Sequence, residues 1–442
     1  MNRFLLGSSG HLGAVTCATL LSFGCGGGGE LTEPEAKARA EALKAPITIE
    51  SFGANVVSRW HEVAGLTTAA PVSPAGVTPE ERRGGPDMST VQLAVYDAVV
   101  AIAGGHKPYA VTPTAPTAGA SMDAAANEAA YRVLLGLFPS RSALYQGLYD
   151  TVLAEIPAGD AKARGMAVGA EVAQAMLALR ANDGRSVALA DFVPGTQAGD
   201  FRNLNPINQQ AYAIKPFSLT SLTQFRPPGP PALGSAQYAI DFDEVKAIGG
   251  AVSAVRTPLQ TEAARFHTAP PPRFMPTNLQ QFATSHASLA DNARVMAALW
   301  TAIGDAGNAC FEAKYHYHFW RPQSAIQLAA DDGNAATLAD AAWTAAVPTP
   351  NHPEYPSAHG CVTGSTTEVL RQFYGTKKIR FSYTSSVTGT TRAYETTTDF
   401  IQEVMDARVW GGMHFRTSNE HGAELGKNVG QWVMERHFQP VD

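Results

Sequence analysis

Charged residues are scarce in this sequence. Asp, Glu, Lys and Arg make up 16% of the 442 residues, well below the roughly 25% of an average globular protein. The 33 Lys and Arg against 39 Asp and Glu give a formal net charge of −6, which excludes the broad basic field of a nucleic-acid-binding protein. Any anion that the protein binds must therefore meet a local cluster of cations.

Long hydrophobic runs are also missing. Beyond the N-terminal segment, no apolar run reaches the roughly 18 residues that a transmembrane helix needs, so none is expected. Hydrophobic residues nevertheless account for 45% of the chain and aromatic residues for 9%. This content excludes a disordered chain and is enough for a large core.

Cysteine is rare as well, with four residues in the chain, and one of them marks the N-terminal segment. Arg3 supplies a positive end and residues 12–23 a short apolar stretch, which are features of an export signal. Cys25 follows a small residue and precedes a glycine run, which resembles a bacterial lipoprotein processing site, although Ser22 stands where that site usually has Leu. A plain secretory signal with a nearby cleavage point is the alternative.

Both interpretations predict export. We expect residues 1–24 to be a signal peptide and residues 25–50 a flexible tether, with the protein in the bacterial cell envelope or secreted. A lipid anchor on Cys25 would make it a periplasmic or outer-membrane lipoprotein. Without the signal, Cys310 and Cys361 are the remaining cysteines, and an oxidising compartment permits a disulfide between them. Two buried free thiols are the alternative.

The spacing of apolar residues is mostly helical, which predicts an all-α fold of two packed helical bundles. Residues 51–235 are expected to form an N-terminal bundle and a long Pro-rich connection, and residues 236–442 a C-terminal bundle. A small β-hairpin is expected over residues 380–399, which are rich in Thr and Ser. Helices are expected over residues 87–102, 124–138, 160–180, 242–266, 279–320 and 357–374.

Three short motifs in the last third of the chain carry candidate chemistry. In the first, Lys314 precedes Arg321-Pro322. Seven residues are nearly two helical turns, so a continuous helix would place both cations on one face, about 10 Å apart along its axis. Pro322 is expected to push Arg321 out of α geometry and to end the helix there. The alternative is that Lys314 and Arg321 belong to a solvent-exposed face of the helix and bind no anion.

The second motif, residues 356–360, opens a predicted helix. Ser357 is a natural N-cap, and the free backbone N–H groups behind it form an anion site that the helix dipole strengthens. His359 lies in the first turn, next to any anion that binds. A satisfied cap followed by a core His is the alternative.

The third motif joins Arg408 to His414. On a straight helix these two residues would face different directions, but Gly411-Gly412 can bend the chain so that both point into one site. Taken alone, this motif says little.

The order and spacing of the three motifs, Lys-x6-Arg-Pro, Pro-Ser-x-His and Arg-x5-His, resembles a known signature. Vanadium-dependent haloperoxidases share it with type 2 phosphatidic acid phosphatases and bacterial acid phosphatases. Residues 137–140, 177–184 and 315–322 are also similar to the soluble bacterial haloperoxidase-related branch, so the resemblance covers most of the chain beyond the N-terminal segment. It identifies the C-terminal bundle as the catalytic one.

In that superfamily a tetrahedral oxyanion, vanadate or phosphate, is bound where the three motifs meet. The resemblance implies vanadate as the cofactor, and phosphate can occupy the same site. Arginine suits such a site because its planar fork bonds two oxygens at once. The resemblance implies that His414 bonds the metal or the phosphorus and that His359 is the acid–base partner. It also implies that the oxygens of the oxyanion contact Lys314, Arg321, Arg408, the Ser357 hydroxyl and the Ala358 backbone N–H.

The sequence departs from the family pattern at several positions. Ala358 stands where Gly is usual, which matters little if only its backbone N–H is used, and Ala407 replaces a usual Ser. Ser418 stands where an Asp often orients the histidine that corresponds to His414. Ser418, Glu420 or a backbone carbonyl could orient the ring instead.

The resemblance implies a haloperoxidase that oxidises halide with hydrogen peroxide. His352, seven residues before His359, is similar to a histidine of the bromide-using enzymes, where the chloride-using ones have Phe. This favours bromide or iodide over chloride, with an ordinary loop histidine as the alternative. The other function to weigh is an acid phosphatase that hydrolyses phosphate monoesters through a phosphohistidine. Either enzyme acts on small molecules.

Overall fold

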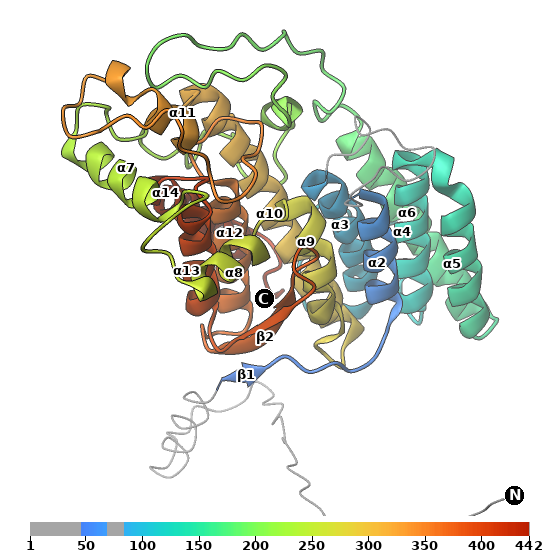
Figure 1. Ribbon diagram of the computed structural model, residues 1–442. Coiled ribbons are helices and arrows are strands. Elements are labelled where there is room, and N and C mark those ends of the chain that lie inside the picture. The colour runs from blue at the N-terminus through green and yellow to red at the C-terminus, as the bar shows by residue number, and fades with distance from the viewer. Residues whose placement is uncertain (1–45, 69–83, 442) are drawn as a thin grey trace, which may run out of the picture. The chain divides into compact units, whose positions relative to one another are not determined.

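The computed structural model describes residues 46–68 and 84–441, and helices dominate it (Figure 1). The prediction of a mainly α-helical fold is confirmed. The predicted signal peptide, most of the predicted tether and Cys25 lie outside the described residues. Among the helices that the structure describes, none is long and apolar enough to cross a membrane.

A first group of helices comes from the N-terminal half of the chain. It consists of α2 (Val56–Thr68), α3 (Gly85–Ala103), α4 (Met122–Leu137), α5 (Ser142–Glu155) and α6 (Asp160–Arg180). Helix α4 packs against both α3 and α6. Gly165 and Gly169 allow the close approach of α6, since a Cβ at either would lie 2.3 Å from a backbone oxygen at the start of α4.

A second group surrounds α10 (Leu289–Tyr317) in the C-terminal half. Its long members are α12 (Ala358–Phe373), α13 (Thr397–Trp410) and α14 (Arg416–Arg436). Helix α10 packs against α3 of the first group and against α12 and α14 of the second (Figure 1). One hydrophobic core therefore runs through both groups. The domain boundary predicted between residues 235 and 236 remains a prediction.

Shorter helices complete the second group. They are α7 (Ala236–Ile248), α8 (Pro258–Phe266), α9 (Pro271–Leu279) and α11 (Pro322–Gln327). The structure has α7 and α8 where one helix was predicted over residues 242–266. Gly249-Gly250 ends the first helix and Pro258 begins the second, because neither glycine nor proline favours a helix interior.

The predicted hairpin is confirmed. Strands β2 (Ile379–Thr384) and β3 (Thr391–Tyr394) pair antiparallel, with Phe381 opposite Tyr394. A short strand β1 (Ile47–Thr48) pairs parallel with β2, with Ile47 beside Ile379. This strand falls within the segment predicted as a flexible tether, so the end of that segment is ordered by backbone hydrogen bonds to the sheet.

The long connection before α7 has no helix except the 3-10 turn Gln209–Ala213. It is held against the end of α10 by hydrogen bonds, because Tyr315 and Tyr317 donate their hydroxyls to the carbonyls of Ile207 and Pro227, each at 2.7 Å. A disulfide joins Cys310 of α10 to Cys361 of α12, with the Cα atoms 6.3 Å apart, which settles the alternative of two free thiols.

Candidate active site

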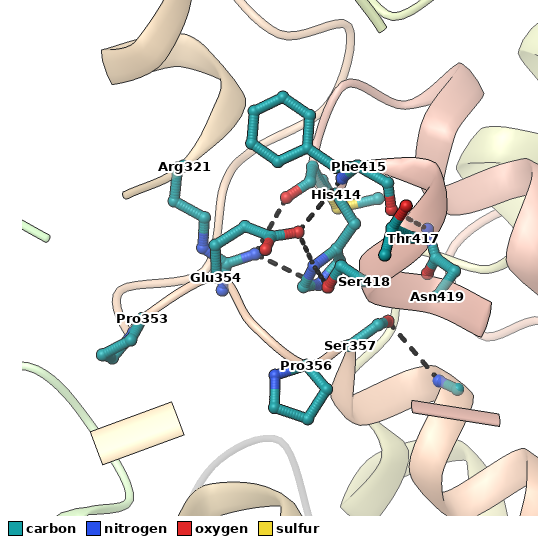
Figure 2. A network of polar contacts seen from close by, with 12 residues as sticks. Arg321, Pro353, Glu354, Pro356, Ser357, His414, Phe415, Thr417, Ser418 and Asn419 are labelled. Carbon is teal, nitrogen blue, oxygen red and sulfur yellow. Dashed lines mark hydrogen bonds and ion pairs between the residues drawn. The ribbon is translucent and has the colours of Figure 1, made fainter. Parts of the chain in front are cut away.

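The three motifs meet beside the N-terminal end of α12, whose N-cap is Ser357 (Figure 2). Lys314 lies in the last turn of α10, Arg321 immediately precedes α11, and Arg408 lies in the last turn of α13. His414 lies in the loop between α13 and α14. None of these five side chains is more than 3% exposed. A protein with few charges therefore buries three cations in one region.

The backbone that positions Arg321 differs from the predicted continuous helix. Helix α10 ends at Tyr317 because His318 adopts a left-handed conformation (φ 49), so Lys314 and Arg321 do not share a helix face and that prediction is wrong. Arg321 is extended before Pro322, as predicted. Its Nη1 donates to the carbonyl of Met413 at 2.9 Å and lies 3.1 Å from His414 Nε2.

Lys314 is held by the loop that leads to α12. Its ammonium donates to the carbonyls of Pro353 (2.9 Å) and Glu354 (2.8 Å). Burial, assisted by the positive charge of Arg321, lowers the pKa of Lys314 well below its usual value. An anion at the site would favour the protonated ammonium.

Arg408 has unused donors. Its Nη1 donates to the carbonyl of His267 at 2.7 Å, but within the described part of the chain Nε and Nη2 have no hydrogen-bond partner. Burial lowers the pKa of Arg408 to about 9. A buried guanidinium with unsatisfied N–H groups is costly unless a ligand accepts from it. Arg408 is therefore suited to an oxyanion.

His414 is turned toward the cations by a bend in the chain. Gly411 ends α13 and Gly412 takes a positive φ of 76, which confirms the predicted bend. The two ring nitrogens of His414 face opposite charges. Nδ1 lies 2.8 Å from Glu354 Oε1, and Nε2 lies 3.1 Å from Arg321 Nη1 (Figure 2). With Glu354 ionised, Nδ1 carries the proton and Nε2 keeps the lone pair that a metal or phosphorus needs.

Glu354 was not predicted as a site residue. It is fully buried, and its Oε1 also accepts the backbone N–H of Phe415 at 3.0 Å. Burial raises the pKa of Glu354 to about 7, against the opposing effects of Arg321 and Lys314. Among the orienting groups proposed for His414, Ser418 contacts Nδ1 only at 3.5 Å and Glu420 is exposed. The sequence itself shows only that Glu354 is the single acidic residue between Asp340 and Glu368, two residues before Pro356.

The start of α12 has the predicted geometry. The Ser357 side chain caps the helix by accepting from the Gly360 N–H at 3.4 Å, and Ala358 begins the helix. His359 is stacked on Phe274, with its Nε2 3.0 Å from the carbonyl of Ala269. A carbonyl can only accept, so Nε2 carries the proton and Nδ1 carries the lone pair. Burial and the nearby Arg408 lower the pKa of His359 well below its usual value.

His352 is buried rather than an open loop residue. Its Nδ1 lies 3.0 Å from Arg321 Nη2, its backbone carbonyl accepts from Arg321 Nε at 2.9 Å, and its ring meets the edge of Phe311. The structure thus places His352 directly behind one of the three cations. Its proposed effect on halide choice stays a prediction.

Comparisons with known proteins match the part of the chain that carries the three motifs. Residues 294–442, which contain all three motifs, match the family model described as the VCPO second helical-bundle domain. Vanadium chloroperoxidase from Curvularia inaequalis is 30% identical in an alignment of 179 residues, which covers 33% of this chain and 29% of that enzyme. The alignment therefore spans less than a third of the relative's length.

Solved structures with the same fold cover nearly the whole chain. A bacterial vanadium-dependent iodoperoxidase has a TM-score of 0.67 at 20% identity, over 88% of this chain and 96% of its own. A holo-type bacterial vanadium-dependent chloroperoxidase has a TM-score of 0.68 at 15% identity, over 87% and 98%. All three motifs lie within the matched domain, which supports the predicted resemblance to the superfamily of vanadium-dependent haloperoxidases and type 2 phosphatidic acid phosphatases.

Proposed function

We propose that the protein is a vanadate-dependent haloperoxidase, which oxidises bromide or iodide with hydrogen peroxide. The observation that carries the proposal is the buried cluster of Lys314, Arg321 and Arg408 around His414 Nε2, which lies 3.1 Å from Arg321 Nη1. Among the described residues, Arg408 Nε and Nη2 have no partner. The names of the relatives, vanadium chloroperoxidase and vanadium-dependent iodoperoxidase, support the same reaction class.

The buried donors fit a tetrahedral oxyanion. Arg408 offers Nε and Nη2, and Lys314 and Arg321 supply positive charge from the other two motifs. Ser357 and the backbone N–H of Ala358, at the positive end of the α12 dipole, complete the set of donors. His414 Nε2, which keeps its lone pair while Nδ1 carries the proton, would form the bond to vanadium.

When bound, vanadate supplies a Lewis acid that activates hydrogen peroxide toward attack by halide. The chain's own residues neutralise the anion, exclude water by their burial, and move protons. His359 is placed for the last task because its Nε2–H is committed to the Ala269 carbonyl, so Nδ1 is the atom that accepts and returns a proton. His352, in contact with Arg321, is the residue proposed to favour bromide or iodide over chloride.

A phosphatase is the second candidate, and one observation favours it. The Glu354 carboxylate beside His414 Nδ1 is an arrangement that raises the basicity of Nε2, as a phosphohistidine mechanism requires. The absence of an acidic residue at position 418 is therefore no argument against this candidate. In that reaction His414 Nε2 would attack phosphorus and His359 would protonate the leaving alcohol.

An experiment with metal-stripped protein separates the two candidates. We expect orthovanadate to restore bromide oxidation by peroxide, inorganic phosphate to compete with it, and the His414→Ala variant to stay inactive because the only covalent anchor is gone. The stripped protein should also be assayed on a phosphate monoester. If vanadate only inhibits an ester hydrolysis that is already present, the haloperoxidase proposal is wrong and the phosphatase takes its place.

We also propose that the mature protein begins at or near Cys25 and lies in the cell envelope, because the Cys310–Cys361 disulfide requires an oxidising compartment. Mass spectrometry of the envelope fraction tests this. Intact Met1 on cytoplasmic protein would contradict it.

A further inference from the structure

The turn between α8 and α9 bonds two site residues at once. The carbonyl of His267 accepts from Arg408 Nη1 at 2.7 Å, and the carbonyl of Ala269 accepts from His359 Nε2 at 3.0 Å. These are backbone atoms two residues apart, whereas Arg408 and His359 come from different helices. The position of this turn therefore affects the direction of the Arg408 guanidinium and the tautomer of His359 together.

The side chain of His267 anchors the turn. Its Nε2 lies 2.9 Å from Glu403 Oε1, an oxygen that also accepts the Tyr394 hydroxyl at 2.7 Å. The other Glu403 oxygen accepts from Arg392 at 2.7 Å. The His267 ring is only 4% exposed, so water competes little for the bond to Glu403.

Helix α13 holds the turn at two points. Glu403 contacts the ring of His267, and Arg408, five residues further along the same helix, contacts its carbonyl. The first contact lies outside the oxyanion site and the second within it. If the ring lost Glu403, the contact of the turn with α13 would depend on Arg408, the group that the oxyanion needs.

We propose that His267 and Glu403 are positioning residues of the oxyanion site, which hold the turn 267–269 so that its carbonyls fix the Arg408 guanidinium and keep the proton of His359 on Nε2. The proposal rests on the proposed function in so far as the site binds an oxyanion. Neither residue touches the anion, and the two act only through Arg408 and His359.

The test uses the full-length, metal-stripped protein and two measurements. Calorimetry gives the affinity for inorganic phosphate, and nitrogen NMR of labelled histidine gives the tautomer of His359. We expect Glu403→Ala and His267→Phe to weaken phosphate binding by about 10- to 100-fold, the range found for residues that orient a site from outside it. We also expect the His359 signals to shift toward a mixture of tautomers.

Two matched variants separate positioning from general damage. Glu262→Gln removes the other carboxylate paired with Arg392 but does not touch His267, so it should leave both measurements unchanged. Glu403→Gln keeps an oxygen acceptor for His267 and Tyr394, and it should restore most of the affinity that Glu403→Ala loses. It also provides a folded protein if Glu403→Ala does not fold.

Unchanged phosphate affinity and unchanged His359 signals in folded His267→Phe would overturn the proposal. Equal losses in Glu262→Gln and Glu403→Gln would overturn it as well, because they would trace the effect to the Arg392 ion pairs. If the unmodified protein binds neither phosphate nor vanadate, the proposed function fails. The His359 signals then still decide whether the turn is held as proposed.

Discussion

At the scale of single residues, the sequence was most informative where spacing carries chemistry. The sequence indicated four site residues, because their spacing matches the family signature in a chain that has few charges: Lys314, Arg321, Arg408 and His414. Glu354 could not be chosen this way, since nothing in local spacing shows which loop carboxylate reaches a histidine 60 residues later. Its contact depends on how the loops fold around the bend at Gly412.

The first prediction concerns Glu354→Gln. The amide keeps an oxygen for the Nδ1–H of His414 and the N–H of Phe415, but it removes the negative charge that raises the basicity of Nε2. Vanadate, for which we propose a bond to Nε2, should bind about tenfold more weakly. Phosphate, held by the cations and by the donors of α12 without a bond to Nε2, should bind as well as before or more tightly. Calorimetry with both anions tests this.

Ser418→Ala is the matched control, because Ser418 lies 3.5 Å from the same ring nitrogen. It should change neither affinity. Equal weakening of vanadate and phosphate by Glu354→Gln would mean that Glu354 only supports the loop.

A second prediction concerns acid stability and His61. This ring of α2 is fully buried beside Trp300, with Nδ1 2.5 Å from Gln280 Oε1 and no partner for Nε2 among the described residues. Burial lowers the pKa of His61 to about 4. The unfolded chain therefore binds a proton at higher pH than the folded one. Stability is lost as the pH falls from about 6.5 toward 4, by up to about 3 kcal/mol.

His61→Asn provides the comparison, because its amide N–H can replace Nδ1–H toward Gln280 while no group titrates. The variant's free energy of unfolding, relative to the unmodified protein, should improve between pH 7 and pH 4. Urea unfolding at several pH values measures this difference. A difference that is constant with pH would refute the assigned shift.

At the scale of elements, helix positions followed from apolar spacing, whereas several helix ends did not. The helix at 160–180 was predicted to end at Arg180, as the structure has it, but Asp160 was expected as its N-cap and is instead its first residue, after Gly159. The helix predicted over residues 279–320 was too long at both ends. In the structure α10 begins after the N-cap Ser288 and ends before His318, whose left-handed conformation depends on the tertiary structure. The close contact that the glycines of α14 make with α12 was also not predicted. Gly422, Gly426 and Gly430 recur every four residues and face α12.

The third prediction follows from that close contact. A Cβ at Gly426 would lie 1.9 Å from the carbonyl oxygen of Cys361, backbone that cannot rotate away. Gly426→Ala should therefore push α14 from α12 and cost about 1–3 kcal/mol. Gly147→Ala in α5 has no atom within 4 Å of the new Cβ and should be neutral or slightly stabilising. Thermal unfolding compares the two, and equal melting temperatures would contradict the argument.

At the scale of the whole molecule, α10 connects the two helix groups to the site. It packs against α3 along one side and α12 along another, and its last turn carries Lys314. All three motifs belong to the second group, so the first group contributes a shared core rather than site residues. The sequence could indicate two bundles, but only the fold shows that one core joins them.

The last prediction concerns the bond between α10 and α12. Cys310 lies one turn before Lys314, and Cys361 one turn after Ser357, so the disulfide joins the two helices next to the anion site. It closes a loop of 51 residues, which in the chain-entropy model stabilises the fold by about 4 kcal/mol. Cys310→Ala/Cys361→Ala should lower the melting temperature. It should also weaken phosphate binding, because Lys314 and Ser357 are then joined only by packing. If added phosphate raises the melting temperature of the double variant as much as that of the unmodified protein, the bond stabilises the fold without organising the site.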